Sequence, residues 1–189
     1  MSLFQRFGLS DILRQRLEDA RQRVLRMELS ELQEPSLAGH LEKLWRSSRS
    51  DNFPVLQRAS KRGTRRQVSY PTDDYDREVV RNMTVVDVSV PFEGDGQLFH
   101  VRPSTCAILN EEIDVSGNYI LYTMPLDPSA EPQFEKMLDQ IEVNLGRLRS
   151  ETEQFDKTAV QELLRVADDR RRELEADEKS LSGFSFPIN

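Results

Sequence analysis

The spacing of hydrophobic residues changes twice along this 189-residue chain. Over residues 10–33 and 131–181, apolar residues recur every three to four positions, the period of an amphipathic helix. Between these segments, residues 79–125 alternate apolar and polar positions and are rich in β-branched residues, as strands are. The pattern predicts an α+β fold, with N-terminal helices, a small antiparallel sheet of three to four strands, and long C-terminal helices.

The N-terminal part of the chain is expected to form two helices. Ser10 is placed to cap a helix over residues 10–33, and Pro35 is placed to open a second, shorter one. Ser30 and Gln33 have the spacing of a capping box, which predicts that a helix restarts nearby. The apolar faces are expected at Leu13, Leu17, Val24, Leu25 and Leu32 in the first helix and at Leu37, Leu41, Leu44 and Trp45 in the second.

Residues 49–78 combine serines, two prolines and clustered charges, a composition that disfavours regular structure and predicts a linker. Within it lies a basic run that contains no acid, and phosphate groups bind lysine and arginine without requiring a particular fold. The candidate nucleic-acid contacts are therefore Arg58, Lys61, Arg62, Arg65 and Arg66. The expected segments are residues 1–48 (helical), 49–78 (charged linker), 79–126 (small sheet) and 127–189 (long helical segment with an apolar tail).

The most distinctive stretch of the sheet region is PFEGDGQLFHVRPST, residues 91–105. Gly94 and Asp95 are residue types found in tight connections, so we expect a turn there rather than an active-site loop. A short strand over residues 97–101 would follow, and Pro103 would turn the chain again.

Two further strand predictions follow this stretch. Residues 106–109 are apolar and short enough for a strand. Residues 111–124 predict two strands joined by a turn at residues 116–118, where Gly117 supplies a permissive backbone.

The C-terminal helical segment contains a near-heptad stripe, the pattern by which helices associate. Thr158 and Gln161 could form another capping box, so a break or kink is expected near residues 156–158. One bent helix and a hairpin of two helices both remain open. The candidate contacts for a partner or for self-association are Phe134, Leu138, Ile141, Leu145 and Leu148.

The formal net charge of -7 is unevenly distributed. Residues 1–66 hold 14 Lys/Arg and 8 Asp/Glu, whereas residues 67–126 hold 3 and 10, and residues 127–189 hold 9 and 15. A basic N-terminal third can meet nucleic acid, another chain or the acidic parts of this one, and it can equally be a solvated helix face.

Residue types that carry chemistry are sparse. The two histidines, His40 and His100, lie far apart, and Cys106 has no second cysteine, so neither a metal site nor a disulfide is expected. The chain has no glycine-rich phosphate loop, and we expect no cofactor and no enzymatic activity. His100 and Arg102 remain the most plausible binding residues in the turn region. The single cysteine and the absence of a long apolar run predict a cytoplasmic protein without a membrane span.

The stretch at residues 91–105, together with the helical region after it, resembles a region of uncharacterised bacterial defence-type proteins. Those proteins share the pattern P-F-x-G-D-x-x-L-F-x-x-R-P-S-[ST], followed by an arginine-rich helix and an ending of small residues plus F-P. The sequence LNEEIDVSG after Cys106 departs from the pattern, because a proline-containing turn is usual there. The matching residues are Pro91, Phe92, Gly94, Asp95, Leu98, Phe99, Arg102, Pro103, Ser104, Thr105, Ile141, Leu145, Gly146, Phe155, Arg170, Arg171, Gly183, Phe186 and Pro187.

In such proteins the region precedes an effector, for example a restriction-endonuclease-like nuclease domain. The resemblance implies a non-catalytic sensing, docking or oligomerisation module in defence against phage or foreign DNA. It also implies either that an effector follows Asn189 in the native protein or that a separate partner supplies it. The alternative hypotheses are a nucleic-acid-binding module that uses residues 58–66 and an enzyme with a site around His100 and Arg102.

Overall fold

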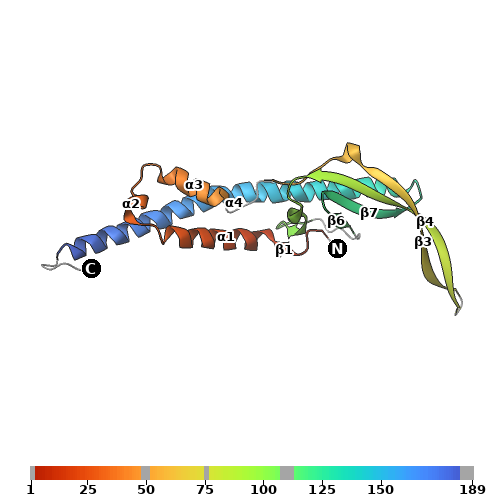
Figure 1. The fold of residues 1–189 in the computed structure, drawn as a ribbon, viewed down its shortest axis with the longest axis horizontal. Helices are drawn as coiled ribbons and strands as arrows, with labels where there is room; N and C mark the ends of the chain where they lie inside the picture. The colour runs from red at the N-terminus through yellow and green to blue at the C-terminus, as the bar shows by residue number, and fades with distance from the viewer. Residues whose placement is uncertain (1–2, 48–51, 75–76, 107–112, 184–189) are drawn as a thin grey trace. The chain divides into compact units, whose positions relative to one another are not determined.

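The computed structural model describes residues 3–47, 52–74, 77–106 and 113–183 (Figure 1). It confirms the α+β class, with N-terminal helices, an antiparallel curled sheet and a long C-terminal helix. The chain divides into two compact units. The first unit comprises Met1–Leu9 and Asn52–Arg149, and the second comprises Ser10–Asp51 and Ser150–Asn189.

The first unit is built around a five-stranded antiparallel sheet in the described residues. The central strand β4 pairs with β7 on one side and with both β2 and β3 on the other, and β6 pairs with β7. A short 3-10 helix, η1 (Arg58–Ser60), separates β2 from β3. The strands are β2 (Val55–Leu56), β3 (Arg62–Asp74), β4 (Arg77–Glu93), β6 (Asp114–Ser116) and β7 (Tyr119–Pro125).

The helix α4 (Ala130–Leu181) covers one face of this sheet with its first half. Val88, Val90 and Ile120 of the sheet are buried on that face, which we call the inner face. The ring of Tyr122 stacks on the ring of Phe134 in α4, with centroids 5.5 Å apart. Each fully buried aliphatic or aromatic side chain contributes roughly 1.5–3 kcal/mol of transfer free energy, so this layer is a main source of stability.

The near-heptad stripe of α4 belongs to this core. All five of its residues, predicted as contacts for a partner, are buried within the chain itself: Phe134, Leu138, Ile141, Leu145 and Leu148. A sheet face and a helical partner both require an apolar stripe, so the spacing alone could not distinguish them. The hypothesis that these residues contact a partner is therefore wrong, and they form part of the core of the chain itself.

The prediction of a linker over residues 49–78 is also wrong for most of its length. Residues 62–74 form β3, which pairs residue by residue with β4. The segment is polar because β3 is an edge strand whose residues 62–67 are exposed. Its cross-strand hydrogen bonds override the local composition.

The turn at residues 93–96 is confirmed as a backbone-shaping element. Gly94 has φ +113°, and a Cβ there would lie 2.7 Å from the carbonyl oxygen of Phe53, so only glycine fits. The Asp95 side chain accepts a hydrogen bond from the backbone N–H of Gln97 and so caps the 3-10 helix η2 (Gly96–His100).

Residues 97–101 were predicted as a strand, but most of them lie in η2, and only β5 (Val101–Arg102) is extended. β5 pairs in parallel with β1 (Phe7–Gly8). The 3-10 turn buries Phe99 against the rings of Phe4 and Phe92, which explains why an apolar pattern is present without a strand.

The hairpin predicted for residues 111–124 is confirmed in its described part. β6 and β7 pair antiparallel, and Gly117 in their turn has φ +56°. Of the strand predicted over residues 106–109, residues 107–109 lie outside the described part of the chain.

The second unit is helical. It contains α1 (Leu9–Val24), whose first residue belongs to the other unit, α2 (Leu29–Leu32), α3 (Leu37–Ser47) and the second half of α4. Trp45 of α3 is 1% exposed, and its Nε1–H donates to Asp156 Oδ1 of α4 at 2.8 Å.

Two local details of the helical predictions require correction. The first helix ends at Val24, not at residue 33, and the capping box before α2 is formed by Glu28 and Glu31 instead of Ser30 and Gln33. The spacing that defines a capping box is short and tolerant of residue type, so several overlapping pairs fit it.

The question left open for residues 131–181 is resolved as a single helix of 52 residues. The break expected near residues 156–158 is absent from it. Thr158 Oγ1 donates to the carbonyl oxygen of Phe155 within the helix, so its hydroxyl caps nothing. In the described residues, no helix combines the length and the hydropathy that a membrane span requires.

Candidate functional site

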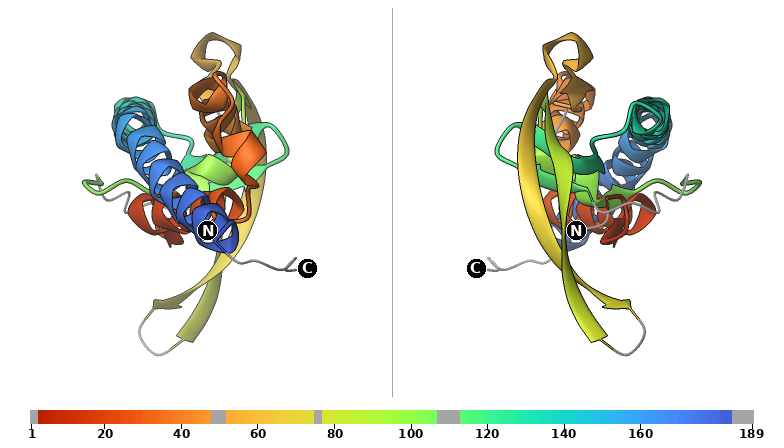
Figure 2. Two further views of the ribbon diagram at one scale, coloured as in Figure 1. Left: turned by 90° about the vertical axis from the view of Figure 1, so that its left-hand side faces the viewer. Right: turned by 90° about the vertical axis from the view of Figure 1, so that its right-hand side faces the viewer.

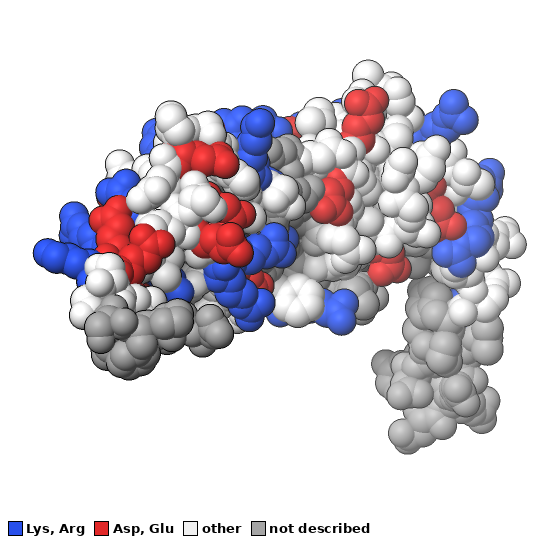
Figure 3. Space-filling view, turned by 60° about the vertical axis from the view of Figure 1, so that its left-hand side comes forward, with Lys and Arg blue, Asp and Glu red and all other residues white. Residues whose placement is uncertain are grey.

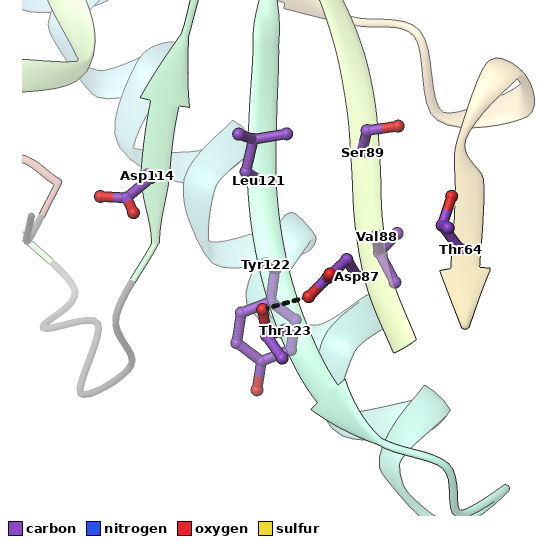
Figure 4. Close-up of a pocket in the computed structure, with 8 residues that line it drawn as sticks. All are labelled: Thr64, Asp87, Val88, Ser89, Asp114, Leu121, Tyr122 and Thr123. Carbon is purple, nitrogen blue, oxygen red and sulfur yellow. Dashed lines mark hydrogen bonds between the residues drawn. The ribbon is translucent and has the colours of Figure 1, made fainter. Parts of the chain in front are cut away.

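The face of the sheet opposite α4, which we call the outer face, contains an open groove of about 690 Å³ (Figure 4). Three adjacent strands and the edge strand β6 contribute to it, and its lining combines hydroxyl and carboxylate groups with apolar side chains. The lining residues are Thr64 of β3, Asp87, Val88 and Ser89 of β4, Leu121, Tyr122 and Thr123 of β7, and Asp114 of β6.

The groove arises from the alternation of side chains along each strand. In β7, Ile120 is buried on the inner face, whereas Leu121 and Thr123 are exposed on the outer face. The antiparallel register places Asp87 of β4 directly opposite Thr123 and Ser89 directly opposite Leu121. The polar residues of two strands are therefore brought together on one surface.

Asp87 of the groove is held by hydrogen bonds from two neighbouring residues. Its carboxylate accepts two hydrogen bonds from the Arg66 guanidinium, from Nε at 2.6 Å and from Nη2 at 3.0 Å. It also accepts one from Thr123 Oγ1 at 2.7 Å, which is drawn in Figure 4. The Arg66 hydrogen bonds, followed by that of Thr123, lower the pKa of Asp87 to about 2, so the carboxylate is ionised at any physiological pH.

Two apolar side chains lie exposed on the same face. Tyr119 is 48% exposed and Leu121 is 39% exposed, and the register places Tyr119 opposite Pro91. An exposed aromatic residue beside pre-ordered polar groups is typical of a protein-binding surface. The outer face therefore combines exposed apolar side chains with a carboxylate, that of Asp87, which accepts hydrogen bonds from Arg66 and Thr123.

The basic run at residues 58–66 is largely neutralised within the chain. Arg58 lies on η1 and forms ion pairs with three carboxylates of α4, those of Glu135 at 2.6 Å, Asp139 at 2.7 Å and Glu142 at 3.1 Å. The hydrogen bonds that Arg58 donates to the carboxylates of Glu135 and Asp139 raise the pKa of Arg58. Lys61 also pairs with Glu135. This carboxylate cluster fixes η1 to the first half of α4.

Arg66 is likewise committed to Asp87, which leaves two members of the run. Arg62 and Arg65 are exposed, and neither forms an ion pair with another residue in the part of the chain that the structure describes. Elsewhere the charges are mixed, and basic and acidic side chains are interspersed on the face drawn in Figure 3.

Some of the turn residues singled out from the sequence shape the backbone, and others lie at the surface. Gly94 and Asp95 shape the turn as described, and Pro103 is buried. Arg102 is exposed on β5. His100 is half-buried, and its Nδ1 is buried without a hydrogen-bond partner in the described residues.

Cys106 is half-buried, and burial raises the pKa of its thiol against the opposing effect of Arg147 and Arg102. A thiol with a raised pKa is a poor nucleophile at neutral pH. Within the described residues, no group of His, Cys, Asp and Glu side chains is arranged to hold a metal ion.

The outer-face groove was not predicted from the sequence. The alternation in β4 and β7 indicates which residues share a face, but it does not indicate which face a helix covers. The buried stripe of α4 decides that question, and its partner could not be identified from spacing alone.

Comparison of the chain with protein-family models, curated proteins and solved structures found no match.

Proposed function

We propose that this chain is a non-catalytic docking module that binds a protein partner or effector domain through the outer face of its sheet. The observation that carries the proposal is the exposure of Tyr119 and Leu121 beside a groove whose central carboxylate, Asp87, is already held by Arg66 and Thr123. A pre-ordered polar group loses little conformational entropy when a partner binds, and an exposed aromatic side chain supplies contact area.

The proposed setting is bacterial defence against phage or foreign DNA. This part of the proposal rests on the resemblance carried by residues 91–105 and by the helical region after them. In that setting the module positions an effector, and the docking surface determines which effector is engaged.

The proposal can be tested by placing a photo-crosslinking amino acid at Tyr119 in the full chain expressed in its native host. Val143 on α4 provides a matched control, because it is 49% exposed against 48% for Tyr119. We expect a discrete crosslinked protein from position 119 and none from position 143. Equal crosslinking from both positions, or none from position 119, would contradict docking through the outer face.

Substitution gives a second arm of the test. Leu121→Lys places a charge on the outer face, whereas Leu25→Lys changes a leucine that is equally exposed, at 39%, just after α1. The crosslinked partner should cease to co-purify with the Leu121→Lys variant and should still co-purify with the Leu25→Lys variant.

A nucleic-acid-binding role remains the second candidate, favoured by the exposure of Arg62 and Arg65. If these residues contact phosphates, binding to double-stranded DNA should weaken with salt and should be lost in the Arg62→Ala/Arg65→Ala double variant. Affinity that is unchanged by the double substitution would exclude this role for the basic run.

A further inference from the structure

One row of side chains crosses the outer face of the sheet from β3 to β6. The register pairs Arg62 of β3 with Ser89 of β4, and Ser89 with Leu121 of β7. It also pairs Leu121 with Asp114 of β6. Residues paired in this way share a face of the sheet, and Figure 4 shows Ser89, Leu121 and Asp114 on successive strands. The row lies where all four strands are paired, whereas the hairpin of β3 and β4 continues past β7 (Figure 2).

The two ends of this row carry opposite charges. Arg62 at the β3 end is exposed, and it forms no ion pair with any other residue that the structure describes. Asp114 at the β6 end is exposed as well. Beside the row, the carboxylate of Asp87 is already paired with the guanidinium of Arg66, so this pair adds no net charge. A partner therefore meets a positive end, an apolar middle at Leu121 and a negative end.

The length of the row matches a short extended segment of protein. Neighbouring strands lie about 4.8 Å apart, so the path from β3 through β4 and β7 to β6 spans roughly 14 Å. An extended chain rises about 3.3 Å per residue, so side chains four positions apart share a face and are separated by roughly 13 Å. Its backbone N–H and C=O groups also need hydrogen-bond partners, unlike those of a helix, and the hydroxyls of Thr64, Ser89 and Thr123 along the groove can both donate and accept. The row therefore favours an extended segment over a helix.

We propose that the outer face binds an extended segment of a partner protein in which an acidic and a basic residue lie four positions apart, with an apolar residue midway between them. This inference rests on the docking function proposed above and specifies the chemistry of the docked segment. The acidic residue pairs with Arg62, and the basic residue pairs with Asp114. The apolar residue packs on Leu121, next to the exposed ring of Tyr119.

The proposed pattern is defined by the charges at its ends and not by the direction of the bound chain. A segment that runs from β3 to β6 and one that runs from β6 to β3 can both place their acid over Arg62. A polyanion such as nucleic acid fits the row poorly, because the carboxylate of Asp114 repels it. A test must therefore vary the signs of the two end charges, since reversing their order leaves the match intact.

The test measures the binding of fluorescent peptides to the full chain by anisotropy. The peptides share one sequence with a central leucine, and they differ only at the two charged positions that flank it. These positions carry one glutamate and one lysine, two glutamates, or two lysines. We expect the wild type to bind the mixed peptide about tenfold more tightly than either of the others, because each of those places a like charge against one end of the row.

Charge reversal at each end of the row should switch this preference. Arg62→Glu should bind the two-lysine peptide most tightly, and Asp114→Lys should bind the two-glutamate peptide most tightly. Arg65→Glu is the matched control, because Arg65 is an exposed arginine of the same strand that lies three positions away and therefore on the other face. It should keep the preference of the wild type.

The proposal is overturned if the wild type binds none of the peptides or all three equally, or if the reversal variants keep the wild-type preference. Crosslinking from position 119 reports separately on docking at the outer face. A crosslinked partner whose yield is unchanged by Arg62→Glu and by Asp114→Lys would leave that docking in place and reject the chemistry of the segment. Absence of any crosslink would instead reject docking itself, so the two failures are distinguishable.

Discussion

The two faces of the sheet are made from alternate residues of the same strands, yet they differ in burial and in polarity. On the inner face, Val90 and Ile120 are almost fully buried beneath α4. On the outer face, Asp87 and Thr123 are tied to each other, and Leu121 is left exposed. Substitutions at neighbouring positions of one strand should therefore have different effects. One position supports the fold, and the next is exposed and available for binding.

The largest expected effect comes from the adjacent pair Ile120 and Leu121. Ile120→Ala should destabilise the fold by about 2–5 kcal/mol, because it leaves a cavity beneath α4. Leu121→Ala should cost about 1 kcal/mol or less, because its side chain is 39% exposed and leaves no enclosed cavity. Urea unfolding of both variants measures the difference. Equal losses of stability would show that both faces are covered.

The next effect concerns the two arginines that link elements of the first unit. Arg58→Gln should cost about 1 kcal/mol, because it removes three ion pairs with α4 at once. Arg66→Gln should cost less, because it breaks a pair with the single carboxylate of Asp87 on the exposed face. Thermal unfolding at low and high salt should show the Arg58 loss shrinking as salt is added.

The outer face should also make a pH-dependent contribution to the free energy of unfolding, through Asp87. The pKa of Asp87 is lowered from 3.8 to about 2 in the folded chain, so its stabilising contribution is fully present above pH 4 and is lost as the pH falls towards 2. Asp87→Asn removes this contribution, so the stability gap between wild type and variant should narrow across that window. Arg66→Gln should flatten the same slope, because the Arg66 hydrogen bonds are the main cause of the shift. A gap that stays constant between pH 4 and 2 would contradict this assignment.

The smallest effect on stability is expected at Tyr119. Tyr119→Ala should change the free energy of unfolding by no more than about 0.5 kcal/mol, because the ring is half exposed. The same substitution should abolish partner binding if the outer face is the docking surface. A large loss of stability would show instead that Tyr119 supports the fold.

Much of the fold could be predicted from local patterns. The helix at α3 and the β6–β7 hairpin follow from apolar spacing and from Gly117, both of which act over a few residues. The segment at residues 62–74 could not be predicted in this way, because its strand conformation depends on hydrogen bonds to β4. The stripe of α4 was predicted to contact a partner or a second copy, but it is buried within the chain, because a sheet and a helix require the same spacing.

The candidate site illustrates the same limit. The residues of the groove are separated by as many as 59 positions in the chain, from Thr64 to Thr123. No short motif connects them, and the antiparallel register alone places Asp87 beside Thr123 and within reach of Arg66.

By itself, the sequence determined the α+β class, the polar and apolar positions of each element, the shape of the Gly94–Asp95 turn and the charge order of β3. These properties depend on side-chain chemistry and backbone preference over one or two turns of chain. The tertiary structure alone decided three further points. They are which face of the sheet α4 covers, that the basic run extends from η1 into the edge strand β3 with Arg58, Lys61 and Arg66 paired to carboxylates, and that α4 is one continuous helix. Those outcomes depend on contacts between distant residues, whose energies a local pattern does not contain.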